Sequence, residues 1–493
     1  MTRINTNVSA LIAQHNLQRS NADLAVRLQR LSTGLKINRG ADDPAGLIVS
    51  ERLRSEIAGV SQAVENIERA TNVIATAEAS LQEINDLLVS IKSLAIEAAN
   101  TGAFSQEEIE ANQLQIDSAI ESITRIANTT SFAGLKLLNG SLDYITEGVT
   151  ASQISDLRIY GVNFGTNDTL PVTVEVLNSA QTASLFISGN TTGAPGALLS
   201  SVTFEVQGVN GAEVFSFVSG TALSAVVYAI NTVKDATGVS ASLVDPANAT
   251  SGMTLNSTGF GSDAFVSVKV LEDGQSFQTF DAQGGNAVNR DTGQDVLALV
   301  NGSLALGDGL DVSLRTNTLN LELTLTTAAA QTANTPYTFT ITGGGATYQI
   351  GPSVNTQQQV GFGIQSVAAS QLGNSIVGYL SSLRSGGDNA LTQGDDSAEQ
   401  ARRATLVIDA AIDQISKLRG RLGAFERNTL QSTLRSSQIA LENLTASESS
   451  IRDTDFAAET SRLTRAQILQ QAGTTTLAIA NSTSSTVLAL LGA

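Results

Sequence analysis

Few residues of this chain could carry catalytic or metal chemistry. The sequence of 493 residues holds no cysteine and one histidine, His15. Without thiolates it can form no Cys-ligated zinc site or iron–sulfur cluster, and one imidazole cannot supply both histidines of an HExxH zinc site. His15 stands in an apolar helical stripe, where a histidine more often packs or hydrogen-bonds than binds a ligand. We therefore expect no enzyme, no metal site and no cofactor.

Two carboxylate pairs and one glycine run are the remaining candidates. Asp42 with Asp43, and Asp395 with Asp396, could form an acid–base or cation site, but each pair stands where a helix is predicted to begin. Carboxylates at that position more commonly cap the helix and interact with its dipole. The glycines of 343–345 lie between predicted strands and lack the helix and lysine of a phosphate-binding loop. All these residues are expected to have structural roles.

The charge balance argues against nucleic acid and membrane insertion. Asp and Glu number 46 against 28 Lys and Arg, a formal net charge of −18, which opposes nucleic-acid binding and docking on anionic lipid. No stretch approaches the roughly 18 consecutive apolar residues of a membrane span, and the first residues do not resemble a cleavable signal peptide. Charged residues are only 15% of the chain, below the roughly 25% of average domains, which indicates self-association.

Composition divides the chain into two arms and a centre. Residues 151–390 hold 17 acidic and 6 basic residues, together with 11 of the 15 Phe and 5 of the 6 Pro. The length allows about three domains. Arms with few prolines and aromatic residues are free to form long helices.

The N-terminal arm is predicted to form two long helices. Asp43 and Pro44 supply an N-cap and a first helical residue, which predicts a helix over about 44–99. Ser105 and Glu108 have the spacing of a capping box, so a second helix is expected to begin there and fold back on the first. The first helix repeats apolar or small residues at steps of three and four: Val60, Val64, Ile67, Thr71, Ile74, Ala77, Leu81, Ile84, Leu88, Ile91, Ala95 and Ala98.

The C-terminal arm has the same pattern. Ser397 and Gln400 have capping-box spacing, and an apolar stripe follows over 404–422 and resumes after a shift at Leu430. Such amphipathic helices are marginal alone, so helices from opposite chain ends must bury their stripes against each other. The two arms are expected to form one composite domain.

The centre changes to the alternating pattern of β-strands. Residues 202–206 and 214–218 predict a hairpin, a short helix is predicted over 222–233, and residues 319–327 alternate strictly. Residues 337–350 predict two strands joined by glycines. The expected fold class is α+β: a long antiparallel helical coiled coil or bundle formed by both chain ends, with a β-rich central insert.

The extreme ends are almost uncharged but keep a helical spacing. Residues 466–493 carry no charged side chain, and both ends place apolar residues at steps compatible with a heptad. Such ends suit pairing with each other and with copies of themselves. The alternative is two frayed tails, although tails disordered by composition are usually highly charged or poor in apolar residues. The candidate contact residues are Ile4, Val8, Leu11, Leu477, Ala480, Val487 and Leu491.

Two stretches of the arms closely resemble the ends of bacterial flagellin, the subunit of the flagellar filament. They are RLSTGLKINRGADDPAGLIVSERL at 30–53 and LTRAQILQQAGTTTLAIAN at 463–481. The opening MTRINTNVSALIAQ and the closing VLALL resemble the family as well, and residues 219–243 resemble a short motif of flagellin and hook-protein inserts. The resemblance implies a structural protein that polymerises through its helical ends and has no active site.

The resemblance also implies an arrangement in three domains. Residues 1–40 with 455–493 would form an inner terminal coiled coil that lines the filament channel. Residues 41–150 with 395–454 would form a helical rod. Residues 151–394 would form a surface-exposed, β-rich insert of one or two subdomains.

Partners and location follow from the same resemblance. The chain would form a homopolymer with itself, and an export chaperone would hold its C-terminal helix before secretion. Filament cap and hook-junction proteins would be further partners. The protein would be extracellular, in the flagellar filament, after export by the flagellar type III apparatus without a cleaved signal peptide.

Flagellins are also recognised by a Toll-like innate-immune receptor through a segment that matches 88–96 here. The chain keeps Leu94 but has Ser90 where the recognised proteins carry Arg, and Gln115 where they carry Glu. Loss of a charged contact at a hot spot costs roughly 2 to 4 kcal/mol. We expect weak receptor activation.

Two other interpretations stay open. A hook–filament junction protein of the flagellin superfamily would be present in few copies, although such proteins match these ends less closely. A sugar-bearing insert is compatible with its many Ser and Thr residues. A zinc peptidase, which some flagellins carry in their insert, is excluded because residues 151–394 contain no histidine.

Overall fold

The computed structural model describes residues 6–165, 167–189, 196–273, 277–393 and 397–491, and for Ala249, Asp273 and residues 483–491 it describes the backbone alone. The chain forms two compact units. One consists of Met1–Thr71, Gln349–Gln358 and Glu426–Ala493, and the other of Asn72–Tyr348 and Gln359–Phe425.

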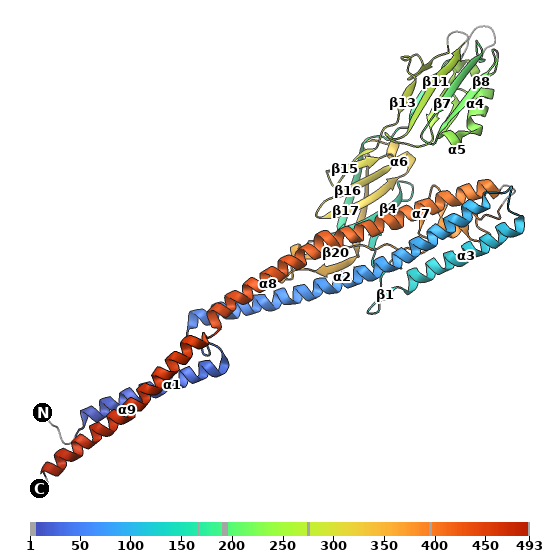
Figure 1. The fold of residues 1–493 in the computed structure, drawn as a ribbon. Coiled ribbons are helices and arrows are strands. Elements are labelled where there is room, and N and C mark those ends of the chain that lie inside the picture. Colours follow the sequence, from blue (N-terminus) through green and yellow to red (C-terminus); the bar gives the residue numbers. More distant parts are fainter. Residues whose placement is uncertain (1–5, 166, 190–195, 274–276, 394–396, 492–493) are drawn as a thin grey trace. The chain divides into compact units, whose positions relative to one another are not determined.

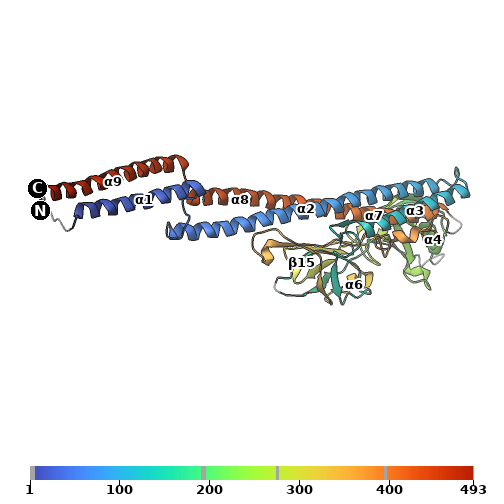
Figure 2. The same ribbon diagram turned by 90° about the horizontal axis from the view of Figure 1, so that it is seen from below.

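Helices from both chain ends build the first unit. α1 (Val8–Thr33) and α9 (Phe456–Leu491) lie side by side (Figure 1, Figure 2). α8 (Gln431–Arg452) lies beside the first part of α2 (Pro44–Ala98), and Arg452 forms an ion pair with Glu51 at 2.9 Å. The predicted association of the two chain ends is confirmed.

Side-chain caps and one glycine define the two ends of α1 and the start of α2. Asn7 Oδ1 accepts a hydrogen bond of 2.9 Å from Ala10 N at the start of α1. Gly34 ends α1 in the left-handed conformation, with φ of +76°, which glycine adopts without strain. At the start of α2, Asp43 Oδ1 accepts a hydrogen bond of 2.9 Å from Gly46 N, so the predicted N-cap is confirmed.

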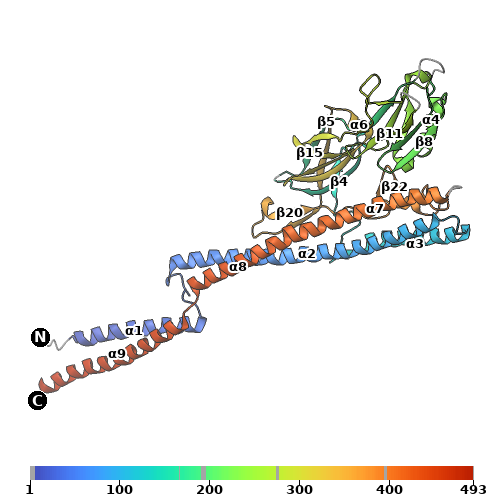
Figure 3. The same ribbon diagram turned by 45° about the horizontal axis from the view of Figure 1, so that its top comes forward.

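Three helices form the helical part of the second unit: α2 from Asn72 onward, α3 (Gln106–Thr129) and α7 (Ser397–Phe425) (Figure 3). Ser105 Oγ accepts a hydrogen bond from Glu108 N, and Glu108 Oε2 accepts one from Ser105 N, which confirms the capping box. The buried residues follow the predicted stripes. They include Ile74, Ala77, Leu81, Ile84, Leu88, Ile91, Ala95 and Ala98 on α2, Ile109, Ile116, Ile120 and Ile123 on α3, and Ala404, Ile408, Ala411, Ile415, Leu418 and Leu422 on α7.

The start of α7 differs from the prediction. Ser397 is itself the first residue of the helix, so it is not the N-cap. Gln400 Oε1, which would complete the capping box, is buried without a hydrogen-bond partner among the residues described. Spacing alone locates a helix end only to within about two residues. The candidate pair Asp395 and Asp396 lies outside the described residues.

A π-helical turn, Glu426–Leu430, precedes α8. A π-turn accommodates one extra residue in a helix, so the apolar stripe beyond it is displaced along the sequence. This is the shift predicted before Leu430, whose side chain is fully buried.

An eight-stranded antiparallel sheet and two four-stranded sheets form the β-rich part of the second unit. The eight-stranded sheet runs in the spatial order β3 (Tyr144–Glu147), β18 (Pro336–Gly344), β5 (Leu170–Asn178), β14 (Leu297–Val300), β15 (Ser303–Asp308), β16 (Asp311–Arg315), β17 (Leu319–Leu325) and β4 (Ile154–Val162). One four-stranded sheet runs β12 (Thr279–Phe280), β6 (Ser184–Ile187), β10 (Met253–Ser257) and β9 (Val239–Leu243). The other runs β13 (Arg290–Thr292), β11 (Phe265–Asp273), β7 (Val202–Gln207) and β8 (Ala212–Phe217).

Short elements complete this unit. The strand pairs are β1 (Ser131–Phe132) with β2 (Leu135–Lys136), β19 (Ala346–Gln349) with β20 (Gln359–Phe362), and β21 (Gly373–Asn374) with β22 (Gly378–Tyr379). The short helices are α4 (Leu223–Thr232), α5 (Lys234–Thr237) and α6 (Thr327–Gln331). The sheets enclose two apolar cores, one inside the eight-stranded sheet and one between the four-stranded sheets and α4.

The predicted strands of the centre are confirmed. β7 and β8 form the hairpin, α4 follows it, and β17 is the strictly alternating strand. The two strands predicted over 337–350 are β18 and β19, but each pairs with other strands. The segment between Leu142 and Ile364, which contains the three large sheets, begins and ends at one place, because Ile364 N donates a hydrogen bond of 3.0 Å to Leu142 O.

Candidate functional site

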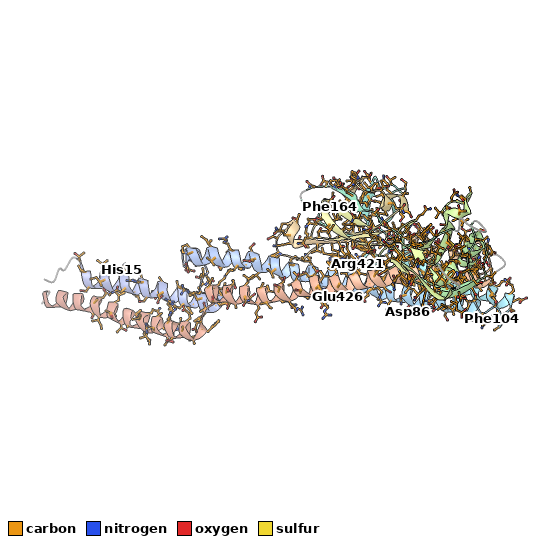
Figure 4. The ribbon with its side chains drawn as sticks, turned by 90° about the horizontal axis from the view of Figure 1, so that it is seen from above. His15, Asp86, Phe104, Phe164, Arg421 and Glu426 are labelled. Atoms are coloured by element: carbon orange, nitrogen blue, oxygen red, sulfur yellow. The ribbon has the colours of Figure 1, made fainter. Side chains whose placement is uncertain are left out.

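His15 lies on α1 (Figure 4) with its side chain exposed to solvent. The stripe that it shares with Val8 and Leu11 faces away from α9, so His15 is not packed within the chain as the sequence suggested. In the described ranges, no group of three or more His, Asp or Glu side chains is arranged to hold a metal ion.

The carboxylates of Asp42 and Asp43 accept hydrogen bonds from backbone N–H groups. Asp42 Oδ2 accepts hydrogen bonds from Arg39 N at 2.8 Å and Asn38 N at 3.0 Å. These bonds, the one from Arg39 first, hold the pKa of Asp42 below its usual range. Asp43 caps α2 as predicted, whereas Asp42 holds the loop before the helix instead of capping it.

The glycine run packs against β3. Gly345 has a φ of +75°, and a Cβ there would lie 2.5 Å from Tyr144 Cζ. A Cβ on Gly344 would lie 2.2 Å from Asp143 O. Gly344 and Gly345 are glycine because a side chain there would collide with the neighbouring strand, whereas a Cβ on Gly343 would have open space.

α1 and α9 meet along a seam whose residues recur at alternating steps of three and four. On each helix these positions are buried or half-buried, while most of the others are exposed. This is the heptad spacing of a coiled coil. The seam residues are Ala10, Ala13, Leu17, Ser20, Leu24, Arg27 and Leu31 on α1, and Glu459, Leu463, Ala466, Gln470, Gly473, Leu477 and Ala480 on α9.

Contacts along the seam show that the helices are antiparallel. Asn7 Nδ2 donates a hydrogen bond of 2.9 Å to Ala480 O at one end. At the other end, Arg27 Nη1 lies 3.0 Å from Glu459 Oε1. Between them, Gly473 lets the helices approach closely, since a Cβ there would lie 3.2 Å from Leu17 Cδ1.

The outward faces of both helices carry large apolar side chains among polar ones. Among the side chains that the structure describes on this pair, eight large apolar ones are more than half exposed: Val8, Leu11, Ile12 and Leu28 on α1, and Phe456, Ile468, Leu469 and Ile479 on α9. A two-helix pair leaves one face of each helix uncovered, so these side chains are available for contact with other protein.

The predicted contact residues fall into three groups. Val8 and Leu11 point outward, whereas Leu477 and Ala480 lie in the seam. The helical backbone of α9 reaches Leu491, but the side chains of Val487 and Leu491 lie outside the described residues, as does the whole of Ile4.

Sequence reasoning missed most of the seam. Ala13, Ser20 and Gly473 are small, and Gln470 is polar, so a search for large apolar residues does not find them. The available signal was the alternating three-and-four spacing of leucines and small residues over 10–31 and 463–480.

The residues considered for receptor recognition lie on α2 and α3. Ser90 and Leu94 are one turn apart on α2, Ser90 exposed and Leu94 half-buried. Ser90 Oγ donates a hydrogen bond of 2.9 Å to the carbonyl of Asp86, labelled in Figure 4. Gln115 is exposed on α3.

A polar cluster ties the eight-stranded sheet to α7. Arg421 of α7 stacks over the ring of Tyr160 on β4, with its Cζ 3.2 Å from the ring centroid. Its Nη2 lies 2.8 Å from Glu322 Oε2 on β17. Burial, and then the negative charge of Glu322, raise the pKa of Tyr160 to about 12. The phenol of Tyr160 therefore stays protonated, and its ring packs against Arg421.

The chain resembles curated flagellins over its whole length. It is 30% identical over 522 residues to a flagellin of Salmonella typhimurium, and the match covers 99% of each chain. The chain belongs to the bacterial flagellin family. This flagellin is also 30% identical, with 99% of each chain covered, to the B-type flagellin of Pseudomonas aeruginosa.

Three segments of this flagellin match models of flagellin regions. Residues 4–143 match the bacterial flagellin N-terminal helical region, 405–491 the C-terminal helical region, and 203–259 the flagellin hook IN motif. Among solved structures, hook-associated protein 3 of Legionella pneumophila is 13% identical, covers 80% of this chain and 97% of its own, and has a TM-score of 0.32. That likeness is too low to support a conclusion.

Family membership establishes the general function. This flagellin is a structural, non-enzymatic subunit of the flagellar filament, and it assembles with copies of itself. The full-length relatives are flagellins, which favours the filament subunit over the hook–filament junction protein. Within the described stretches, no helix combines the length and apolar character needed to span a membrane.

Proposed function

We propose that the outward faces of α1 and α9 are the surfaces through which copies of this flagellin contact one another in the filament. The observation that supports this is the set of eight large apolar side chains left exposed beside the seam. Their burial against other copies removes apolar surface from water, which is the main favourable term in association.

A pair of matched variants tests this proposal. Leu11→Asn with Ile479→Asn changes two outward apolar residues, and Gln14→Asn with Gln471→Asn changes two exposed polar residues of the same helices. We expect the first variant to elongate filament seeds about tenfold more slowly, because loss of about 1.4 kcal/mol of apolar contact corresponds to tenfold. The second should elongate like the unmodified protein. Equal rates for both variants would contradict the proposal.

We propose the three-domain arrangement implied by the family for this chain: 1–40 with 455–493, 41–150 with 395–454, and 151–394. Two backbone hydrogen bonds between the N-terminal and C-terminal segments support the boundary between the first and second domains. Lys36 N donates a hydrogen bond of 2.7 Å to Arg452 O, and Thr454 N donates one of 2.9 Å to Gly34 O. These hydrogen bonds join the two segments at the end of the α1–α9 pair, close to residues 40 and 455. Limited proteolysis should release fragments that end near these positions.

We propose that an export chaperone binds α9 before assembly, with Leu477, Ala480, Val487 and Leu491 in the contact. The last 28 residues carry no charge, so this helix needs a covering partner until α1 and other copies provide one. Family membership supports filament cap and hook-junction proteins as further partners. It also supports an extracellular filament exported without cleavage of a signal peptide, which N-terminal sequencing of filament protein would test.

We propose that this flagellin activates the Toll-like innate receptor only weakly, through a contact that includes Leu94. Ser90 and Gln115 are exposed but uncharged, so the contact lacks two charged residues. In a receptor reporter assay, Ser90→Arg with Gln115→Glu should raise the response at least about tenfold, since a charged hot spot contributes roughly 2 kcal/mol or more. A strong response from the unmodified protein would contradict this prediction.

A further inference from the structure

The seam between α1 and α9 contains one charged residue on each helix. Glu459 is only 2% exposed, and its Oε1 lies 3.0 Å from Nη1 of Arg27. Asp23, one turn before Arg27 on α1, accepts a hydrogen bond of 2.9 Å from Arg27 Nη2 and so orients the guanidinium. Arg462 lies 3.3 Å from the second oxygen of Glu459. The buried carboxylate is therefore satisfied in this pairing of the helices.

The remaining seam residues discriminate poorly between alternative pairings. They are small, apolar or uncharged polar residues that repeat with the same heptad, so α1 could slide along α9 by seven residues with similar packing. That slip would place Glu459 opposite Ser20 and remove it from Arg27. A buried carboxylate without its partner is strongly unfavourable.

We infer that the Arg27–Glu459 ion pair fixes the antiparallel register of α1 against α9. Because both outward faces rotate and shift with the helices, this register also decides which outward residues of the two helices lie side by side. Arg27 and Glu459 are thus positioning residues. The inference concerns pairing within one chain and does not rest on the proposed contacts between copies.

The structure provides a direct reporter of this register. A Cβ on Gly473 would lie 3.7 Å from Leu17 Cβ, within the roughly 3.5–4.5 Å that a disulfide requires. Leu17→Cys with Gly473→Cys therefore reports the observed register. Ala10→Cys with Gly473→Cys reports the slip of one heptad that places Glu459 opposite Ser20. The chain has no cysteine of its own, so any disulfide comes from the introduced pair.

The test compares both cysteine pairs in the full-length chain, before assembly and in seeded filaments, with Arg27 and Glu459 kept or both changed to leucine. With both kept, we expect an intramolecular disulfide from the first cysteine pair and none from the second. Replacing a buried ion pair by apolar residues commonly preserves stability. The Arg27→Leu, Glu459→Leu variant should therefore keep its helical circular dichroism. Its ratio of first-pair to second-pair disulfide should fall by at least about tenfold, equivalent to about 1.4 kcal/mol of register preference.

Several results would overturn the inference. One is an unchanged disulfide ratio in the double-leucine variant. Another is loss of both disulfides together with helix content, which would show that the ion pair serves stability alone. Disulfides that form only between chains, or not at all with Arg27 and Glu459 in place, would show that the helices do not pair in this register. An Arg27→Lys control keeps the charge and should still favour the first disulfide.

Discussion

Arg421 makes two different contacts with one guanidinium group. Its plane covers the Tyr160 ring, and its edge reaches the Glu322 carboxylate. A guanidinium suits this position because it stacks on aromatic faces and also donates hydrogen bonds in its own plane. The contact joins β4 and β17 to α7, so one side chain links two strands of the sheet to the helical part of its unit.

Tyrosine titration tests this cluster. Tyr160 ionises with a pKa of about 12, against 10.0 for an unperturbed tyrosine. The folded state therefore holds its phenolic proton longer than the unfolded state does. The stability contributed by the neutral phenol is fully present below pH 10 and is lost as the pH rises through about 12. Tyr160→Phe should remove part of the late rise in phenolate absorbance, and an unchanged curve near pH 12 would contradict the assignment.

At the scale of elements, the helices and strands differ in how far the sequence predicts them. α2, α3 and α7 were predictable because their stripes consist of large or methyl-bearing residues at regular spacing. α2 and α3 also begin at Asp and Ser caps. The α1–α9 seam was not, because small and polar residues pack there. The order of the strands was not predictable either. β3 pairs with β18 almost two hundred residues later, and alternation fixes the faces of a strand but not its neighbour.

Neighbouring residues of α2 provide a test of the helical core. Leu88 is fully buried, whereas Val89 beside it is 51% exposed. Leu88→Ala should lower the free energy of unfolding by about 2 to 5 kcal/mol, because it removes apolar contacts and leaves a cavity. Val89→Ala should change it by no more than about 0.5 kcal/mol. Urea unfolding followed by circular dichroism gives both values, and similar losses for the two variants would mean that the stripe is wrongly assigned.

At the scale of the whole molecule, the centre of the chain is acidic and the C-terminal end is uncharged. Residues 151–390 carry 17 acidic and 6 basic residues, while residues 466–493 carry no charge. Acidic surface favours contact with water and repels like surfaces, whereas uncharged helices favour burial against protein. This division agrees with a filament subunit whose ends make the contacts between copies, and it explains the low overall content of charged residues.

Seeded elongation of two deletion variants tests the central claim most directly. One variant lacks 466–493, which removes most of the α9 seam. The other replaces 144–362 by a short Gly–Ser link, which the adjacent positions of Leu142 and Ile364 allow. Filament length after addition to seeds, measured by electron microscopy, is the readout. The account predicts no elongation without 466–493 and continued elongation without 144–362. Elongation by the first variant, with failure of a folded second variant, would contradict it.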